Sequence, residues 1–174
     1  GTAQTMVDKT ARRRSAAFPF ELAHRLVCMF SIKGDLVLDP FAGTGTSLAA
    51  ALACGRNAFG VERDETFLPV ARSHLQSMPA FAAAYNRERL GRHVKFAGKR
   101  TAAAEKLKYR NNHYGFPVMT AQEQELLINE VLTVHEAGEG QLAVSYQDEP
   151  QPDFVRDWSL DELADYAAPP ARGS

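Results

Sequence analysis

The chain has 174 residues, of which 45% are hydrophobic and 24% are charged, and its net charge at pH 7 is −1. This composition is typical of a globular domain, and no apolar run approaches the roughly 18 residues of a membrane span, which excludes an integral membrane protein. We therefore expect a cytoplasmic protein that forms one modest core, with no membrane partner.

The first half of the chain predicts alternating helices and strands, because apolar residues recur first at helical spacing and then in short runs between glycine-containing turns. The expected elements are a helix over 21–30, a strand over 36–38, a helix over 47–54 that could begin at Thr46, a strand over 58–61, and a helix capped by Asp64 that ends near residue 76. This alternation predicts an α/β fold.

The second half changes character and predicts a mainly helical C-terminal extension over residues 79–174. Gly91 is expected to end one helix, and Thr120 followed by Glu123 forms a capping-box signature at the start of another. The expected elements are a helix over 80–90, a weakly helical basic segment over 98–110, a turn at 111–115, a helix over 120–135, a short strand around 142–146 and a short helix over 159–166.

Residues 36–47 form the most informative stretch, because a buried strand is expected to run through a glycine turn directly into a helix. Gly43 and Gly45 permit a sharp turn and close approach of a ligand, and the amides at the helix start attract an anionic group. Glu62 follows the second strand, where an acid can accept hydrogen bonds from ribose hydroxyls. Leu48 replaces the third glycine of the dinucleotide fingerprint, so a different nucleotide-like cofactor is predicted.

The string Asp-Pro-Phe-Ala-Gly-Thr-Gly-Thr at 39–46, followed by Gly-Val-Glu-Arg-Asp at 60–64, resembles motif I and acidic motif II of S-adenosylmethionine-dependent DNA amino-methyltransferases. Residues 18–26 resemble motif X of the same family. The resemblance covers roughly residues 10–77. It implies a partial Rossmann-like methyltransferase sheet with flanking helices, in which residues 18–78 bind the cofactor after a basic lead-in at 1–17.

The resemblance also assigns residues to the S-adenosylmethionine site: Phe18, Pro19, Asp39, Pro40, Phe41, Ala42, Gly43, Thr44, Gly45, Thr46, Ser47, Glu62 and Arg63. Glu62 would bind the ribose, and the amides of the turn would lie near the cofactor carboxylate. Phe18 and Pro19 would line the far side of the pocket. Two alternatives stay open, in which Phe41 is a core residue and Asp39 mainly caps the turn. Motif X departs from the family pattern at Arg14 and Ser15, where a His-Pro pair is common.

The order of motif X before motif I resembles the permuted group, whose catalytic Asp, Asn or Ser followed by Pro-Pro and an aromatic precedes motif X. The chain contains no such tetrapeptide; the nearest strings lie at 111–115 and 168–171. In the family this loop accepts the hydrogens of the base amine and stacks on the flipped base. We therefore expect the C-terminal, cofactor-binding part of a site-specific DNA methyltransferase of the restriction-modification kind, inactive alone.

The catalytic and target-recognition half would then lie on other sequence or on a separate chain. One alternative is a non-catalytic subunit that binds S-adenosylmethionine or DNA, and another is an RNA methyltransferase of unpermuted order with a decayed catalytic motif at 111–115. An incomplete sheet would also leave strand edges uncovered, so association into oligomers stays open.

Basic residues concentrate between 87 and 110, with nine Lys or Arg against two acids, whereas residues 121–165 hold twelve acids and one Arg. The candidate contacts to a DNA backbone are Arg12, Arg13, Arg92, Lys95, Lys99 and Arg100. A solvated helix face or an acidic partner is the alternative. Cys28 and Cys54 lie in apolar helical patterns, which predicts buried reduced thiols and no metal site.

Overall fold

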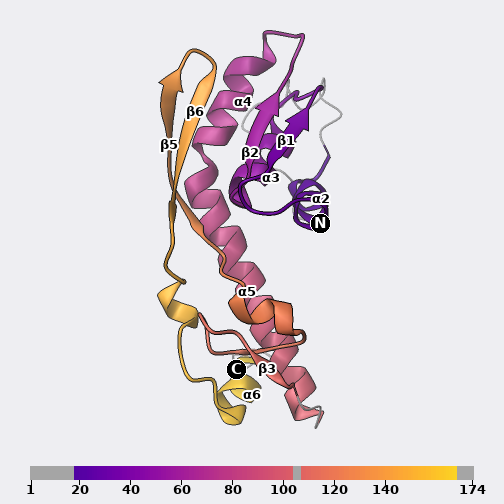
Figure 1. The fold of residues 1–174 in the computed structure, drawn as a ribbon, viewed down its shortest axis with the longest axis vertical. Helices are drawn as coiled ribbons and strands as arrows, with labels where there is room; N and C mark the ends of the chain where they lie inside the picture. The colour runs from indigo at the N-terminus through magenta and orange to yellow at the C-terminus, as the bar shows by residue number, and fades with distance from the viewer. Residues whose placement is uncertain (1–17, 104–106, 168–174) are drawn as a thin grey trace, which may run out of the picture. The chain divides into compact units, whose positions relative to one another are not determined.

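The computed structural model describes residues 18–103 and 107–167, and these fall into two units. Residues 18–83 and 129–147 form the first unit, and residues 84–103, 107–128 and 148–167 form the second. Figure 1 shows the described residues as a ribbon coloured along the chain, with labels on most helices and strands. Arg12 and Arg13 lie outside the described residues.

A strand-helix-strand arrangement organises the first unit. Its elements are α2 (Phe20–Phe30), β1 (Leu36–Asp39), α3 (Thr46–Ala53), β2 (Asn57–Gly60) and α4 (Phe67–Gln76). The two strands pair in parallel with Leu36 opposite Asn57 and Asp39 opposite Gly60, and Figure 1 shows them side by side. The elements expected over the first half of the chain are therefore confirmed, with bounds that shift by one to three residues. The expected cap is wrong, because Thr66 is the N-cap of α4 and Asp64 instead accepts a 3.0 Å hydrogen bond from the Thr66 amide.

Small residues let α3 pack closely on this strand pair. Ala49, Ala50 and Ala51 have no exposed surface. A Cβ atom added at Gly60 would lie 2.7 Å from a methyl group of Leu48 and 2.9 Å from the Cβ atom of Ala42. Because real Cβ atoms do not approach so closely, Gly60 is required for the helix and the glycine turn to lie against β2.

A hairpin from the later part of the chain completes the first unit. Strands β5 (Glu130–Gly138) and β6 (Gln141–Gln147) pair in antiparallel fashion. Glu136 lies 3.4 Å from the guanidinium of Arg72 and accepts a 3.2 Å hydrogen bond from Gln76, both on α4. The Tyr146 hydroxyl donates a 2.8 Å hydrogen bond to the carbonyl of Leu52 on α3. The expected strand around 142–146 is confirmed as β6.

The helix expected over 120–135 is wrong. The capping box of Thr120 and Glu123 is present, but it starts only the short 3-10 helix η1 (Ala121–Glu125). The side-chain amide of Asn111 donates to the carbonyls of Glu123 and Leu126 at 2.7 and 2.8 Å, so these carbonyls end the turn instead of continuing a helix. The following residues pair with β6, a partner that local spacing cannot reveal.

The second unit is built around the long helix α5 (Met78–Ala102), of which residues 84–102 belong to it. Its other elements are β3 (Tyr109–Arg110), β4 (Pro117–Val118), η1, η2 (Pro152–Phe154) and α6 (Leu160–Ala167). It has its own core of buried residues: Leu90, Val94, Ala97, Tyr114, Phe116, Val118, Phe154, Trp158 and Leu163. The expected turn at 111–115 and the short C-terminal helix are confirmed.

The helix break expected at Gly91 is wrong, because α5 runs through this position without interruption. A Cβ atom at residue 91 would lie 3.2 Å from the hydroxyl of Tyr166 on α6. Glycine here therefore makes room for a packed side chain, and it does not end the helix.

The described chain is a mixed α/β structure with three two-stranded sheets. The prediction of a mainly helical C-terminal extension is not confirmed, because β3 to β6 follow α5. Across residues 18–103 and 107–167, every helix is too short or too polar to traverse a lipid bilayer.

Candidate cofactor-binding site

The site predicted from the sequence lies where β1 and β2 end. Because the strands are parallel, their carboxyl ends meet at one edge, which is where open α/β sheets bind ligands. The amide of Val61 donates to the carbonyl of Asp39 at 2.8 Å, and the amide of Ala42 donates to the carbonyl of Val61 at 2.9 Å. The turn after β1 is thus bonded to the segment after β2.

The carboxylate of Glu62 reinforces this connection. One oxygen accepts a 2.7 Å hydrogen bond from the Gly43 amide, and the other accepts a 2.8 Å hydrogen bond from the Asp64 amide. These bonds hold the pKa of Glu62 below its ordinary value, with the Asp64 amide as the larger cause and the Gly43 amide next. An ionised carboxylate has about four acceptor positions, so Glu62 can hold the turn and still accept hydrogen bonds from a ligand.

Asp39 and two glycines set the path of the turn itself. An oxygen of Asp39 accepts a 2.9 Å hydrogen bond from the Phe41 amide, so Asp39 does cap the turn. Gly43 and Gly45 have φ angles of 51° and 79°, which strain other L-residues. Phe41 is 86% exposed, so the alternative that it is a core residue is wrong.

Two residues that the sequence analysis assigned no role also support the turn. His74 on α4 donates from Nδ1 to the carbonyl of Thr44 at 2.9 Å, which anchors the turn to a following helix. Gly60 permits the close packing of α3 described above. The position of Gly60 at the end of the second strand, two residues before Glu62, was a signal for this glycine, whereas nothing in the local sequence marks His74.

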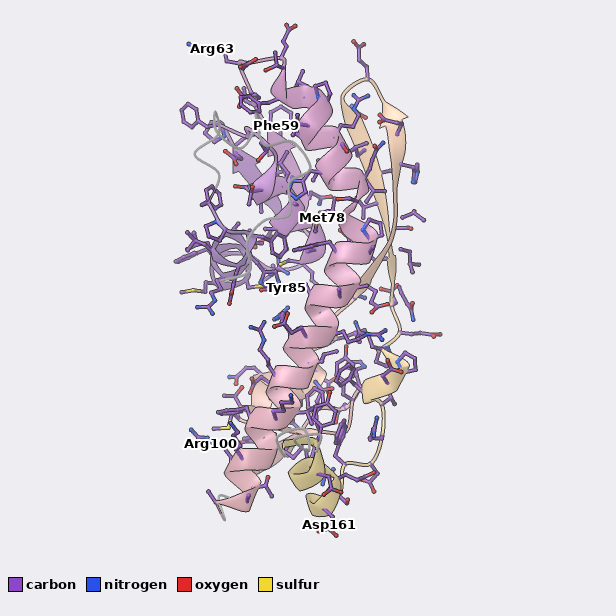
Figure 2. All side chains as sticks on the ribbon, turned by 180° about the vertical axis from the view of Figure 1, so that it is seen from behind. Phe59, Arg63, Met78, Tyr85, Arg100 and Asp161 are labelled. Atoms are coloured by element: carbon purple, nitrogen blue, oxygen red, sulfur yellow. The ribbon has the colours of Figure 1, made fainter. Side chains whose placement is uncertain are left out.

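The remaining candidates differ in exposure. The side chains of Thr44 and Thr46 are buried, Ala42 and Ser47 are half-buried, and Pro40 is exposed. Arg63 is exposed beyond the end of β2. Figure 2 labels Arg63, and it labels Phe59 on β2.

Motif X lies at the beginning of α2. Pro19 is the N-cap of this helix, and Phe18 is 39% exposed directly before it. Helix α2 packs against α3, the helix that the glycine turn starts. Direct hydrogen bonds therefore pair Asp39 with Phe41 and Gly43 with Glu62. Phe18 and Pro19 lie at the start of α2, which is connected to this region by its packing on α3.

The candidate DNA contacts that the structure describes lie on α5 in the second unit. Arg92, Lys95 and Lys99 are exposed at spacings of three and four residues, which places them along one helix face. Phe96 is 41% exposed in the same row, and the guanidinium of Arg100 lies 5.1 Å from the centre of its ring. Arg92 is 3.9 Å from Glu88. Figure 2 labels Arg100 near the end of the helix.

Comparison with known proteins supports the motif-based resemblance. Residues 3–73 match a family model described as DNA methylase. The Type II methyltransferase M.MthZI of Methanothermobacter thermautotrophicus is 40% identical over 126 residues, which cover 72% of this chain and 34% of that protein. The Type II methyltransferase M.MjaI of Methanocaldococcus jannaschii is 53% identical over 58 residues, or 33% of this chain and 19% of that protein.

A crystal structure from Thermus thermophilus, described as a DNA modification methylase complexed with S-adenosyl-L-methionine, is 39% identical over 45% of this chain and 39% of that chain, with a TM-score of 0.36.

The matches to the DNA methylase family model and to the Type II methyltransferases confirm the resemblance to the DNA amino-methyltransferases. The chain spans about a third of M.MthZI and a smaller share of M.MjaI. The alignment with M.MthZI covers 126 of the 174 residues, so it must extend past residue 84, where the second unit begins, whatever its first residue is. The similarity to M.MthZI thus includes the basic helix α5, and the match to the family model includes the glycine turn.

Proposed function

We propose that residues 18–78 bind S-adenosylmethionine as the cofactor-binding part of a DNA methyltransferase. The whole enzyme would transfer the methyl group to the exocyclic amine of adenine or cytosine at a specific DNA site. The observation that carries this proposal is the double hydrogen bond of Glu62, which ties motif II to the glycine turn of motif I. The matches to DNA methylase sequences over the same residues support it.

Each group at the strand ends would have a separate task. The remaining acceptor positions of the Glu62 carboxylate would receive the ribose hydroxyls. The amides of Asp64 and Gly43 hold the pKa of Glu62 below its ordinary value, which favours this ionised form further. Backbone amides at the start of α3 would face the cofactor carboxylate, since a helix N-terminus favours an anion. The exposed ring of Phe41 would cover the cofactor from the turn. Bound S-adenosylmethionine would supply the electrophilic methyl group.

The methyl acceptor would have to be prepared by other sequence. The 174 residues contain no Asp, Asn or Ser followed by Pro-Pro and an aromatic, the group that accepts the hydrogens of the base amine in this family. We propose that a catalytic half, on the same protein or on a second chain, brings this loop to the cofactor. It would also bring the residues that recognise the target sequence.

An exposed apolar sheet face supports the need for such a half. Leu36 and Leu38 alternate along β1, and Phe59 is the β2 partner of Leu38, so these three side chains share one side of the strand pair. Val61 follows two positions after Phe59 and continues the same side. The four residues are 47–67% exposed. Further strands and a helix of the catalytic half would cover this face and extend β1 and β2 into a Rossmann-like sheet.

We further propose that Arg92, Lys95 and Lys99 contact the DNA backbone. Their charges line one face of α5, and the exposed Phe96 within the row could stack on a base. Glu88 partly offsets the charge of Arg92, and the guanidinium of Arg100 lies over the ring of Phe96. Lys95 and Lys99 are therefore the cations of this face that we expect to contribute most.

A methyl-transfer assay separates the two main versions of this function. The chain is mixed with unmethylated genomic DNA and labelled S-adenosylmethionine, alone and after co-expression with the coding sequence that precedes it. Transfer only after co-expression supports the cofactor half of an active enzyme. Binding of S-adenosylmethionine without transfer in both cases favours the non-catalytic subunit, and transfer by the chain alone contradicts a missing catalytic loop.

A further inference from the structure

We propose that His24, Cys28 and Cys54 form a binding site for a thiophilic metal ion, with zinc(II) as the best match. His24 and Cys28 lie one turn apart on α2, so both side chains point to the same side of that helix. Cys54 is the C-cap residue of α3, against which α2 packs. Two helices of the first unit thus bring three metal-binding side chains to one place.

The distances between the three groups are close to those of a metal site. The Sγ atoms of Cys28 and Cys54 are 3.5 Å apart, and the Cys28 Sγ atom lies 3.9 and 4.0 Å from the two ring nitrogens of His24. One ligand atom from each residue falls within 4.8 Å of the others. Tetrahedral zinc would separate two sulfurs by about 3.8 Å and a sulfur from a nitrogen by about 3.6 Å. The two sulfurs and the Cys28–His24 pair are therefore within about half an ångström of these separations, and small side-chain rotations would bring the three groups around one ion.

The donor set determines the class of metal. Two thiolates and an imidazole suit zinc(II) or another borderline or soft ion, whereas magnesium and calcium require oxygen ligands. Deprotonation of both cysteines on binding would balance the double positive charge of zinc. Cys54 also lies at the end of α3 that carries the negative pole of the helix dipole, which favours a bound cation.

Burial makes the cluster both stable and reachable. His24 and Cys54 are only 3% and 9% exposed, which shields the ion from bulk water, while Cys28 is exposed and opens a path to solvent. The expectation that Cys28 is buried is wrong for this reason. Three protein ligands leave a fourth position for water, and a bound ion would fix α2 to the end of α3.

A disulfide is the competing use of the two cysteines. The two sulfurs lie 3.5 Å apart, beyond the bonded distance of about 2.05 Å, so they do not form a disulfide here. Forming the bond would require an external oxidant, whereas metal binding requires only loss of two protons. The two possibilities are distinguished by keeping the protein reduced during the measurement.

The test is a cobalt(II) titration of the full 174-residue chain in a phosphine reductant, followed by displacement with zinc(II). We expect one ion per chain and a thiolate-to-cobalt charge-transfer absorption that zinc abolishes. Cys28→Ser should eliminate this absorption without loss of folding, because the Cys28 side chain is exposed. His135→Gln, which alters an exposed histidine on β5, should leave the titration unchanged.

A second measurement guards against loss of folding in the buried variants. Zinc should raise the Tm of the parent chain and of His135→Gln but not that of His24→Gln or Cys28→Ser, each compared with its own metal-free form. The proposal is overturned if the folded, reduced chain takes up no cobalt, if Cys28→Ser binds it as the parent does, or if the cysteines only form a disulfide when the reductant is withdrawn.

Discussion

The Gly43 amide donates a 2.7 Å hydrogen bond to the carboxylate of Glu62, so the glycine turn after β1 and the acid after β2 form one unit. Nineteen positions separate the two residues in sequence. A change at either residue should therefore alter the geometry of both motifs. This connection makes Glu62 a support of the turn as well as a proposed ribose ligand.

The same bond makes the stability of the turn sensitive to acid. Backbone donors hold the pKa of Glu62 in the folded chain below its ordinary value of 4.5. A lowered folded pKa means that this contribution is complete above the unfolded pKa and disappears as the pH falls through the folded one. We expect the Tm difference between the parent chain and Glu62→Gln to be constant near neutrality and to shrink below about pH 4.5. A difference that grows on acidification would contradict the lowered pKa.

Gly60→Ala tests the close packing beneath the site. The new Cβ atom would fall 2.7 Å from Leu48 and 2.9 Å from Ala42, so the turn and α3 must move. We expect a loss of about 1–3 kcal/mol in the free energy of unfolding, measured by urea denaturation. Gly138→Ala serves as the control, because its new atom would meet only the flexible Gln141 at 3.4 Å or more. Equal stability of the two variants would contradict the packing argument.

Gly91→Ala tests why a glycine lies within α5. Alanine should favour the helix by about 1 kcal/mol, but its Cβ atom would approach the Tyr166 hydroxyl to 3.2 Å. Removing that hydroxyl by Tyr166→Phe should release the full gain. In a double-mutant cycle we therefore expect Gly91→Ala to stabilise the Tyr166→Phe background more than the parent. Equal destabilisation by Gly91→Ala in both backgrounds would contradict the role of the Tyr166 hydroxyl in limiting the space at residue 91.

The basic row on α5 is testable by the salt dependence of DNA binding. If Lys95 and Lys99 each neutralise one phosphate, replacing either by Ala should reduce the slope of log affinity against log salt by roughly 0.9. Arg87→Ala is the matched control, since Arg87 is already paired with Asp153 at 3.0 Å. Fluorescence anisotropy with one duplex at several salt concentrations measures the slopes. An unchanged slope in both Lys variants would exclude this face as a phosphate contact.

The sequence allows prediction of the strand-helix-strand core, because its strands are short apolar runs and its glycine turn lies between adjacent elements. The hairpin of β5 and β6 is different. Val131 and Val134 have spacing that also fits a helix, and only pairing with β6 and the side-chain amide of Asn111 decide the outcome. Such distant partners leave no mark in local spacing.

The residues of the candidate site likewise include some that local sequence predicts and some that depend on distant contacts. Asp39, Gly43 and Glu62 were predictable from their positions at or just after the ends of strands. In the structure the Asp39 carboxylate accepts from the Phe41 amide, and the Glu62 carboxylate accepts from the Gly43 amide. His74 was not predictable, because its bond to the Thr44 carbonyl depends on how α4 folds back. The exposure of Cys28 likewise depends on which part of α2 packs on α3.

The most direct test is calorimetric titration of S-adenosylmethionine into the chain, its Glu62→Ala variant and its Glu65→Ala variant. Glu65 is an exposed acid three positions away and serves as the control. We expect one molecule bound per chain, an affinity about tenfold to a hundredfold weaker in Glu62→Ala, and no change in Glu65→Ala. Equal affinity of the parent and Glu62→Ala, or no binding by the folded parent, would contradict a cofactor site at the ends of β1 and β2.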